Sequence, residues 1–256
     1  MEFLSASNKK IKRIQALQRS AKDRREEDVF IAEGIRMFRE APAELLQEVY
    51  MTPEMADLTS TKTDYPTYIV ESAAFSKMSD TQTPQGVLTV LKRPHYSLEQ
   101  VTDGDDPLIL ILENLQDPGN LGTILRVGEA AGVTGFIMSK GTVDIFNPKV
   151  VRSTMGSVFR MPFIYVDDIE QVTKDLKKRG IVTYASHLEG SGEYTSFDYK
   201  KPTAFMVGNE GNGLTDGLTA LADERIRIPM EGSVESLNAG IAAAVLTYEA
   251  HRQRSL

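Results

Sequence analysis

The chain has 256 residues, of which 41% are hydrophobic and 25% are charged, a balance typical of a globular protein with one or two domains. It contains no cysteine, which excludes disulfides and thiolate metal ligands, and its three histidines lack the spacing of metal ligands, so we expect no bound metal. No apolar run approaches the roughly 18 residues that cross a bilayer, and no signal-peptide pattern opens the chain, so we expect a cytoplasmic protein without membrane contact.

Basic residues concentrate near the start of the chain, although the net charge is −7. The segment 8–25 has a single acid, Asp23, and eight basic residues: Lys9, Lys10, Lys12, Arg13, Arg19, Lys22, Arg24 and Arg25. Lysine and arginine displace the counterions of a nucleic-acid backbone, so this segment is a candidate phosphate-binding arm. A solvated helix face explains the same charges, and charge alone does not decide between the two interpretations.

Short elements alternate in the first third of the chain. Apolar spacing at Ile11, Ile14 and Leu17 predicts a helix over 8–21. Strands are predicted at 29–32, 48–52, 68–71 and 86–91, with helices at 36–40 and 72–78. This alternation predicts a small α/β domain over 1–92, and the prolines and acids of 93–107 predict a linker.

Wholly apolar strands start at Leu108. They are predicted at 108–112, 135–139, 163–166, 182–186, 204–207 and 225–228, and helices are predicted at 120–131, 148–155, 169–179, 213–221 and 236–252. Apolar strands that alternate with helices predict a parallel sheet covered on both faces, so we expect a second α/β domain over 108–256. Ligands bind such sheets at the carboxyl ends of the strands, where three loops of this chain carry unusual residues.

The first of these loops follows 108–112 and reads ENLQDPGNLGTILR. Pro118 and Gly119 predict a sharp turn, and Asn120 can cap the helix that follows. Arg126 lies on that helix among apolar residues, and its guanidinium can hold a phosphate or a carboxylate through two hydrogen bonds. Taken alone, a capped helix with a solvent-directed arginine is the simpler interpretation.

The second loop follows 204–207 and reads GNEGNG, and its glycines let a ligand approach the backbone. It departs from the G-x-G-x-x-G pattern of dinucleotide sites, which weakens an NAD-binding interpretation. The third loop follows 225–228, reads PMEGSVESLN and leads into a helix rich in alanine. Ser236 and Asn238 stand at the start of this helix, where residues of these types more often cap than catalyse.

In this order and spacing, the three loops resemble the three motifs of the SpoU (TrmH-like) family of RNA ribose 2′-O-methyltransferases, within the SPOUT superfamily. The matching blocks read DPGNLGTILRVGEAAG, FMVGNEGNGL and IPMEGSVESLNAGIAAAVLTYEA, and STMGSVFRMPF resembles the family's connecting segment. The segment 22–39, with FIAEG at its centre, and TPQGV at 83–87 resemble the family's RNA-binding domain, which is similar to small ribosomal proteins. The likeness covers nearly the whole chain.

The resemblance implies a C-terminal parallel sheet tied in a deep trefoil knot, with S-adenosylmethionine as cofactor and a homodimer formed through the knotted domain. The cofactor-binding residues that it implies are Val207, Gly208, Ile228, Met230, Leu237 and Asn238. The catalytic residues that it implies are Arg126, Asn120, Glu210, Ser236 and Asn238, and the candidate RNA-binding residues are Lys9, Lys10, Lys12, Arg13, Lys22, Arg24 and Arg25.

Two details qualify the implied catalytic site. Asn120 and Glu210 would orient Arg126 and the ribose. A guanidinium stays protonated in water, so we expect Arg126 to bind the target phosphate and to activate the hydroxyl electrostatically rather than to act as a base. Glu113 opens the first motif where many relatives carry aspartate, a departure that leaves the expected activity intact.

Several functions remain open at this point. An N-terminal RNA-binding domain favours a large folded RNA, which points first to 23S ribosomal RNA and second to tRNA. A methyltransferase that protects ribosomes from an antibiotic would share this architecture. A non-catalytic RNA-binding or ribosome-assembly factor is the alternative from another class, although the joint presence of the five candidate catalytic residues argues against it. An NAD-dependent oxidoreductase rests on the glycine-rich loop alone.

Overall fold

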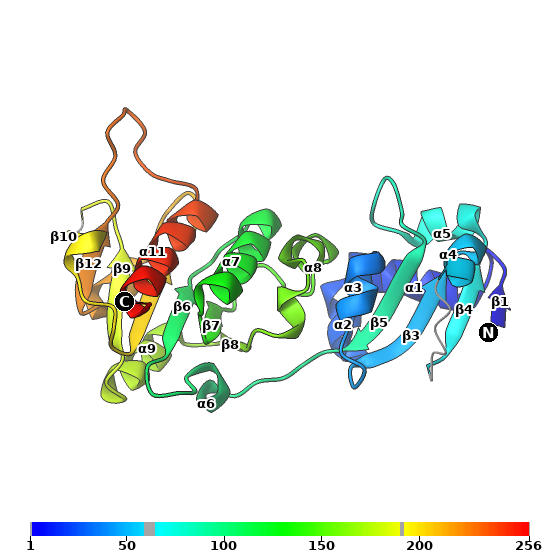
Figure 1. Cartoon of the computed structure of the whole chain (residues 1–256), viewed down its shortest axis with the longest axis horizontal. Coiled ribbons are helices and arrows are strands. Elements are labelled where there is room, and N and C mark those ends of the chain that lie inside the picture. Colours follow the sequence, from blue (N-terminus) through cyan, green and yellow to red (C-terminus); the bar gives the residue numbers. More distant parts are fainter. Residues whose placement is uncertain (1, 59–64, 190–191, 256) are drawn as a thin grey trace. The chain divides into compact units, whose positions relative to one another are not determined.

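The computed structural model describes residues 2–58, 65–189 and 192–255, which form two compact units (Figure 1). The N-terminal unit comprises Met1–Pro94 together with Asp144–Phe159, and the C-terminal unit comprises His95–Val143 together with Arg160–Leu256. The segment Asp144–Phe159 therefore lies inside the stretch 108–256 in sequence, whereas its packing assigns it to the N-terminal unit. No described helix is long and apolar enough to cross a membrane.

The N-terminal unit contains a mixed five-stranded sheet in the order β1-β4-β3-β5-β2. The strands are β1 (Glu2–Leu4), β2 (Val29–Glu33), β3 (Leu46–Met51), β4 (Thr67–Val70) and β5 (Val87–Lys92). The helices are α1 (Lys9–Arg19), α2 (Ala21–Glu26), α3 (Ile35–Glu40), α4 (Pro53–Leu58), α5 (Ser72–Met78) and α8 (Pro148–Thr154). One core cluster joins Ile11, Ile14 and Leu17 of α1 to Phe75 of α5 and to the strands, so the apolar spacing that predicted the first helix also buries it.

A buried ion pair holds the segment Asp144–Phe159 in the N-terminal unit. Arg24 on α2 is 3% exposed, and its Nη2 donates to Oδ2 of Asp144 over 2.6 Å. Its Nη1 donates to the carbonyl oxygen of Leu17 over 2.7 Å. The ring of Phe146 packs 4.6 Å from that of Phe30 on β2, so apolar contact supports the ion pair.

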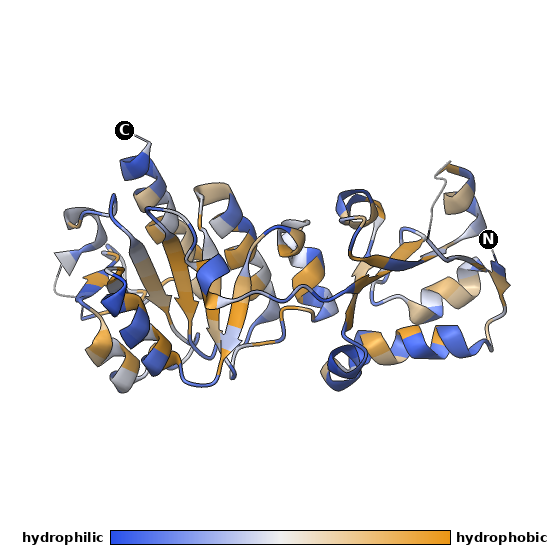
Figure 2. Cartoon of the chain, turned by 90° about the horizontal axis from the view of Figure 1, so that it is seen from below, coloured by the Kyte–Doolittle hydropathy of each residue, from blue (hydrophilic) through white to orange (hydrophobic). Residues whose placement is uncertain are grey.

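The C-terminal unit is built on a seven-stranded parallel sheet in the order β10-β12-β9-β11-β6-β7-β8. The strands are β6 (Leu108–Leu112), β7 (Gly135–Ser139), β8 (Phe163–Val166), β9 (Val182–Ser186), β10 (Gly192–Glu193), β11 (Thr203–Val207) and β12 (Glu224–Arg227). Every residue of β6, β7 and β11 is buried, and Figure 2 shows the apolar strands between more polar helices. The expected α/β fold with a covered parallel sheet is therefore confirmed.

Helices cover both faces of this sheet. They are α6 (Leu98–Val101), α7 (Pro118–Ala131), α9 (Ile169–Lys178), α10 (Asp216–Leu221) and α11 (Ala239–Arg254). Helices α9 and α10 share a core cluster with Ile109 and Ile111 of β6, while α7 and α11 lie side by side (Figure 1). Val207 pairs with Leu112 and Met206 with Ala185, so β6, β9 and β11 end at the same edge.

The predicted elements match these bounds to within a few residues, with instructive exceptions. Helix α11 starts at Ala239 rather than at residue 236, because Asn238 is its N-cap and accepts from the backbone N–H groups of Gly240 and Ile241. The predicted linker contains the short helix α6, which Ser97 caps. The sequence did not predict β1, α2, α4 or β10, which are all short.

Candidate active site

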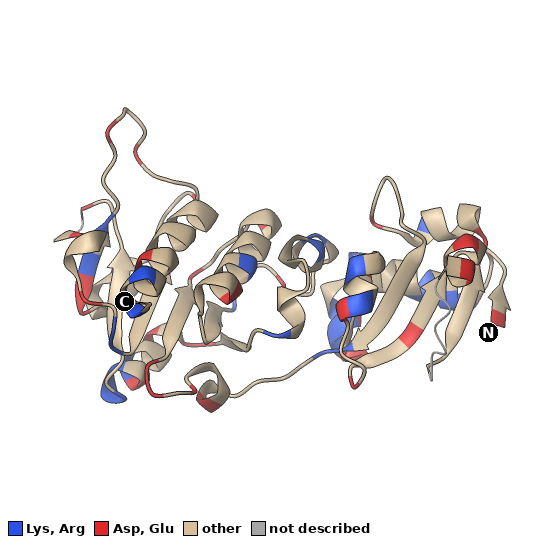
Figure 3. Ribbon diagram, viewed as in Figure 1, with Lys and Arg blue, Asp and Glu red and all other residues tan. Residues whose placement is uncertain are grey.

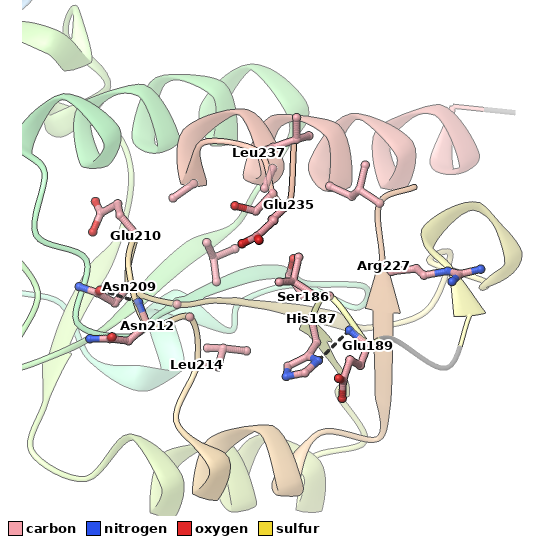
Figure 4. Close-up of a pocket in the computed structure, with 18 of the residues that line it drawn as sticks. Ser186, His187, Glu189, Asn209, Glu210, Asn212, Leu214, Arg227, Glu235 and Leu237 are labelled. Atoms are coloured by element: carbon pink, nitrogen blue, oxygen red, sulfur yellow. Dashed lines mark hydrogen bonds between the residues drawn. The ribbon is translucent and has the colours of Figure 1, made fainter. Parts of the chain in front are cut away.

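A cavity of about 800 Å³ opens where the strands of the C-terminal sheet end (Figure 4). Its walls are the loops that follow β9, β11 and β12, with the first turn of α11. The lining residues are Ser186–Glu189, Val207–Leu214, Arg227–Met230, Glu235–Leu237, Ala239 and Ala242. This volume is that of a site for a small molecule or a nucleoside cofactor.

The loop after β11 turns tightly at Gly208 and Asn209. The side-chain oxygen of Asn209 accepts from the backbone N–H groups of Gly211 and Asn212 over 2.9 and 3.1 Å. A Cβ on Gly208 would lie 2.1 Å from the carbonyl carbon of Gly213, so no side chain fits there. The glycine thus lets the two arms of the turn touch and leaves its backbone facing the cavity.

We expect Gly208→Ala to open this turn and to weaken ligand binding in the cavity by at least about tenfold, because the added methyl group meets backbone that cannot move aside cheaply. Gly232→Ala is the matched control, since its Cβ would meet nothing within 4 Å and the residue does not line the cavity. Calorimetric titration of both variants with S-adenosylmethionine, the cofactor that the sequence resemblance implies, measures the difference. Equal affinities for the two variants would contradict the argument.

A buried carboxylate fixes the far end of the same loop. Glu113 follows β6, is 5% exposed, and accepts from both the backbone N–H and the hydroxyl of Thr215 over 2.8 Å each. The hydroxyl of Thr215 in turn caps α10. Sequence reasoning noted Glu113 only as a departure from aspartate and missed this anchoring role. The signal available was a charged residue that directly continues a buried strand, where an acid must find partners.

Three side chains from three loops form one hydrogen-bonded chain beside the cavity. Nδ2 of Asn238 donates to Oδ1 of Asn120 over 2.8 Å, and Nδ2 of Asn120 donates to Oε1 of Glu210 over 3.0 Å. Glu210 also accepts from the backbone N–H groups of Gln116 and Asp117 over 3.1 and 3.0 Å. These bonds tie the loop after β6 to the loop after β11 and to the start of α11.

The hydrogen bonds to Glu210 hold it as a carboxylate. Burial opposes its ionisation, but the donors Asn120, Asp117 and Gln116 outweigh burial and lower the pKa of Glu210 below its usual value of 4.5. Since the folded pKa is the lower one, these bonds stabilise the folded loop above the unfolded pKa. The stabilisation is lost as the pH falls from about 4.5 through the folded pKa.

We therefore expect Asn120→Ala to raise the pKa of Glu210 toward its usual value, because the variant removes the strongest of its donors. Titration of the side-chain carboxyl carbon by NMR in glutamate-labelled protein measures this shift directly. Asn212→Ala is the control: Asn212 lies in the same loop, and its side chain makes no hydrogen bond within the described chain. An unchanged pKa in Asn120→Ala would show that the backbone donors alone hold the carboxylate.

Comparison with known proteins identifies the family of this chain. The model of the SpoU rRNA Methylase family matches residues 107–248, which is more than half of the chain. The chain belongs to the SpoU rRNA methylase family. A second model, the MRM3-like substrate binding domain, matches residues 8–89. The expected family is therefore confirmed, and the chain is a methyltransferase.

Relatives of this SpoU-family chain match it over different lengths. The 23S rRNA (guanosine(2553)-2′-O)-methyltransferase RlmP of Bacillus subtilis is 32% identical over 95% of this chain and 96% of its own length. The SpoU methyltransferase AviRb of Streptomyces viridochromogenes, solved with AdoMet, superimposes with a TM-score of 0.88 at 27% identity, over 97% of this chain and 98% of that one. The A. aeolicus TrmH/SpoU tRNA modifying enzyme covers only 61% of this chain and 79% of its own, with a TM-score of 0.53 and 30% identity.

S-adenosylmethionine is the cofactor of the SpoU-family chain, and the cavity suits it. Glycines 208, 211 and 213 leave backbone accessible on one wall, while Leu214, Met230 and Leu237 supply apolar surface against which an adenine can pack. No group of three or more potential metal ligands occurs among the described residues. The residues present therefore fit a nucleoside cofactor held by backbone and apolar contacts.

The structure places the predicted site residues of this SpoU-family chain in three ways. Lining the cavity are Val207, Gly208, Glu210, Ile228, Met230, Ser236 and Leu237. Asn120 and Asn238 do not line it but join Glu210 through the hydrogen-bonded chain. Arg126 lies exposed on α7 and makes no hydrogen bond or ion pair with the described residues, so the expectation that Asn120 and Glu210 orient it is not met in this chain alone. Sequence reasoning missed Ser186–Glu189, because the loop after β9 carries no motif, and it passed over Arg227 beside the third motif and Glu235 within it.

Four of the seven candidate RNA-binding residues already contact other side chains of the N-terminal unit. Arg13 bridges Glu27 and Glu48, and Lys10 lies over the ring of Tyr68. Lys22 pairs with Glu26 at the surface. Arg24 is buried against Asp144, which leaves it no surface for a phosphate, so we withdraw it from the RNA-binding set. Lys9, Lys12 and Arg25 are exposed and have no partner among the described residues. Figure 3 marks the lysines and arginines along the ribbon in blue.

Proposed function

We propose that this SpoU-family protein transfers a methyl group from S-adenosylmethionine to a ribose 2′-hydroxyl of 23S ribosomal RNA. The observation that carries the proposal is the chain Asn238–Asn120–Glu210 at the rim of a cofactor-sized cavity. The bound cofactor supplies a methyl group already activated on a sulfonium. In the transfer a bond forms from the ribose oxygen to the methyl carbon as the bond from sulfur to that carbon breaks, and the hydroxyl proton passes to solvent water.

The protein's own residues act by placing the hydroxyl. The side-chain oxygen of Asn120 accepts from Asn238, and one of its amide N–H groups donates to Glu210. Its second amide N–H is therefore free to donate to the ribose. Ser236 lines the cavity, and its hydroxyl has no partner within the described chain. Together they fix the approach of the ribose, which is where most of the acceleration arises when the methyl donor is already reactive.

Arg126 supplies positive charge for the phosphate next to the target ribose. Its guanidinium has no partner in the described chain and matches a pair of phosphate oxygens in geometry. Its cationic field also favours loss of the hydroxyl proton. Because Arg126 does not line the cavity, we propose that a second subunit brings it and the cofactor together.

A face formed by α7 and α11 supports such a homodimer. Ile241 and Tyr248 are each 49% exposed and stand two turns apart on α11. Thr123 and Arg126 are exposed on the adjoining α7. Covering large apolar side chains of this kind is what subunit contacts do. We also predict a trefoil knot in the C-terminal unit, with α11 as the threaded helix. We expect the enzyme to work in the cytoplasm, where its ribosomal substrate is.

Ribosomal RNA is favoured over tRNA by the share of the chain that each relative matches. The chain carries a substrate-binding unit in addition to the methyltransferase region, and RlmP matches it along nearly its whole length. The tRNA-modifying relative covers 61% of it. A tRNA substrate is the second candidate, and a non-catalytic ribosome-assembly factor is the third.

We expect the exposed cations of the N-terminal unit to contact RNA phosphates. Replacing Lys9, Lys12 and Arg25 with glutamine should weaken binding to ribosomal RNA. The slope of log affinity against log salt concentration should become less steep by about 2, because each lost phosphate contact removes roughly 0.7–0.9 from it. Glutamine at Lys174, Lys200 and Lys201, which are exposed in the C-terminal unit, is the control. If both triple variants change the slope equally, the effect is one of net charge and the assigned surface is wrong.

The proposed activity is tested by mapping ribose methylations in RNA from cells with and without the gene. We expect one 2′-O-methyl mark in 23S ribosomal RNA to disappear and to return when purified protein and S-adenosylmethionine are added. Loss of a mark in tRNA would establish the second candidate. Protein that binds RNA but releases no heat with S-adenosylmethionine would instead be the non-catalytic factor.

A further inference from the structure

The charged side chains that line the cavity are mostly acidic. The described lining residues include Glu189, Glu210 and Glu235, against one arginine, Arg227. Arg227 extends away from these carboxylates toward β10 and pairs with Glu193 at 3.9 Å (Figure 4). The backbone N–H of Glu189 donates to Nδ1 of His187 over 3.1 Å. The interior of the cavity therefore has an excess of negative charge.

Two of these carboxylates differ from Glu210 in having no partner. Glu210 accepts three N–H donors, and its charge serves to join loops. The side chains of Glu189 and Glu235 make no hydrogen bond or ion pair within the part of the chain that the structure describes. Glu235 points into the space between the loops and Glu189 stands at its edge (Figure 4). Because both carboxylates are exposed and have no partner among the described residues, a cation in the cavity interacts favourably with both.

We infer that Glu189 and Glu235 make the cavity select the cationic methyl donor over the spent cofactor. The inference rests on the proposed function. S-adenosylmethionine carries a sulfonium, whereas S-adenosylhomocysteine has a neutral thioether and otherwise the same groups. The negative lining stabilises the first and not the second. Methyl transfer removes the positive charge from the cavity, and the two carboxylates thus favour exchange of product for fresh donor.

The test compares the affinities of three ligands for the full chain by calorimetry at low ionic strength. The ligands are S-adenosylmethionine, S-adenosylhomocysteine and sinefungin, which has an ammonium group in place of the methyl sulfonium. In Glu235→Gln and in Glu189→Gln, we expect affinity for the two cationic ligands to fall by about threefold to tenfold each. We expect affinity for the thioether to change by less than about twofold, since it lacks the charge.

Glu231→Gln is the matched control, because Glu231 is exposed in the same loop as Glu235 but does not line the cavity. High salt should reduce the difference in affinity between S-adenosylmethionine and S-adenosylhomocysteine in the unmodified protein. In the variants, the same increase in salt should leave that difference almost unchanged. Equal loss for all three ligands would overturn the inference and assign the glutamates a role in shaping the loops. A protein that binds none of the three would overturn the proposed function itself, which separates the two failures.

Discussion

Arg126→Ala should reduce methyl transfer by about a hundredfold to a thousandfold while leaving affinity for S-adenosylmethionine within about twofold. The reason lies in its position: the guanidinium is exposed on α7, has no partner among the described residues and does not line the cofactor cavity. Its charge is therefore available to the RNA phosphate. Losses of this size are typical when one preorganised electrostatic group is removed from a transfer reaction.

Single-turnover methylation of the RNA substrate, with calorimetric cofactor binding on the same preparations, measures both quantities. Arg126→Lys keeps the charge but not the paired donors and should recover only part of the rate. Lys174→Ala, which removes an exposed cation from α9 of the same unit, is the control. A parallel loss of cofactor binding in Arg126→Ala would show that the arginine belongs to the cofactor site, and the phosphate assignment would be abandoned.

Asp144→Asn should lower the free energy of unfolding of the N-terminal unit by about 3–5 kcal/mol. The variant leaves the guanidinium of Arg24, which is 3% exposed, without its counter-charge in the protein interior. The same ion pair anchors the segment Asp144–Phe159, so its backbone amides should lose protection from hydrogen exchange. Urea unfolding followed by circular dichroism, with hydrogen exchange read by mass spectrometry, reports both effects.

A double-mutant cycle separates the ion pair from other effects of the substitution. Arg24→Met combined with Asp144→Asn should cost less than the sum of the two single variants, because the partners are in contact. Lys22→Ala on the same helix is the control, since the pair Lys22–Glu26 is 75% and 64% exposed and contributes less than about 1 kcal/mol. If Asp144→Asn cost no more than this control, Arg24 would have to be hydrated in the folded protein.

The sequence by itself determined the elements and the order of the loops. Mainly apolar runs predicted the strands β6, β7, β8 and β9 with their observed bounds, because a strand covered on both faces carries few polar side chains. The motif after β11 identified Gly208 and Glu210, and both line the cavity. Short segments of sequence are enough to predict these features, because each depends on the burial or the backbone conformation of the residues in that segment.

Only the tertiary structure decided which of these residues meet. Asn120 contacts Glu210 across 90 positions and Asn238 across 118, and no local pattern encodes either pair. Arg24 shows the limit most clearly, because its basic neighbours suggested RNA while its partner Asp144 lies 120 positions away. The charge pattern of a sequence shows only that a cationic side chain is present. The burial of that side chain and its nearest acidic residue determine whether it binds RNA or another part of the protein.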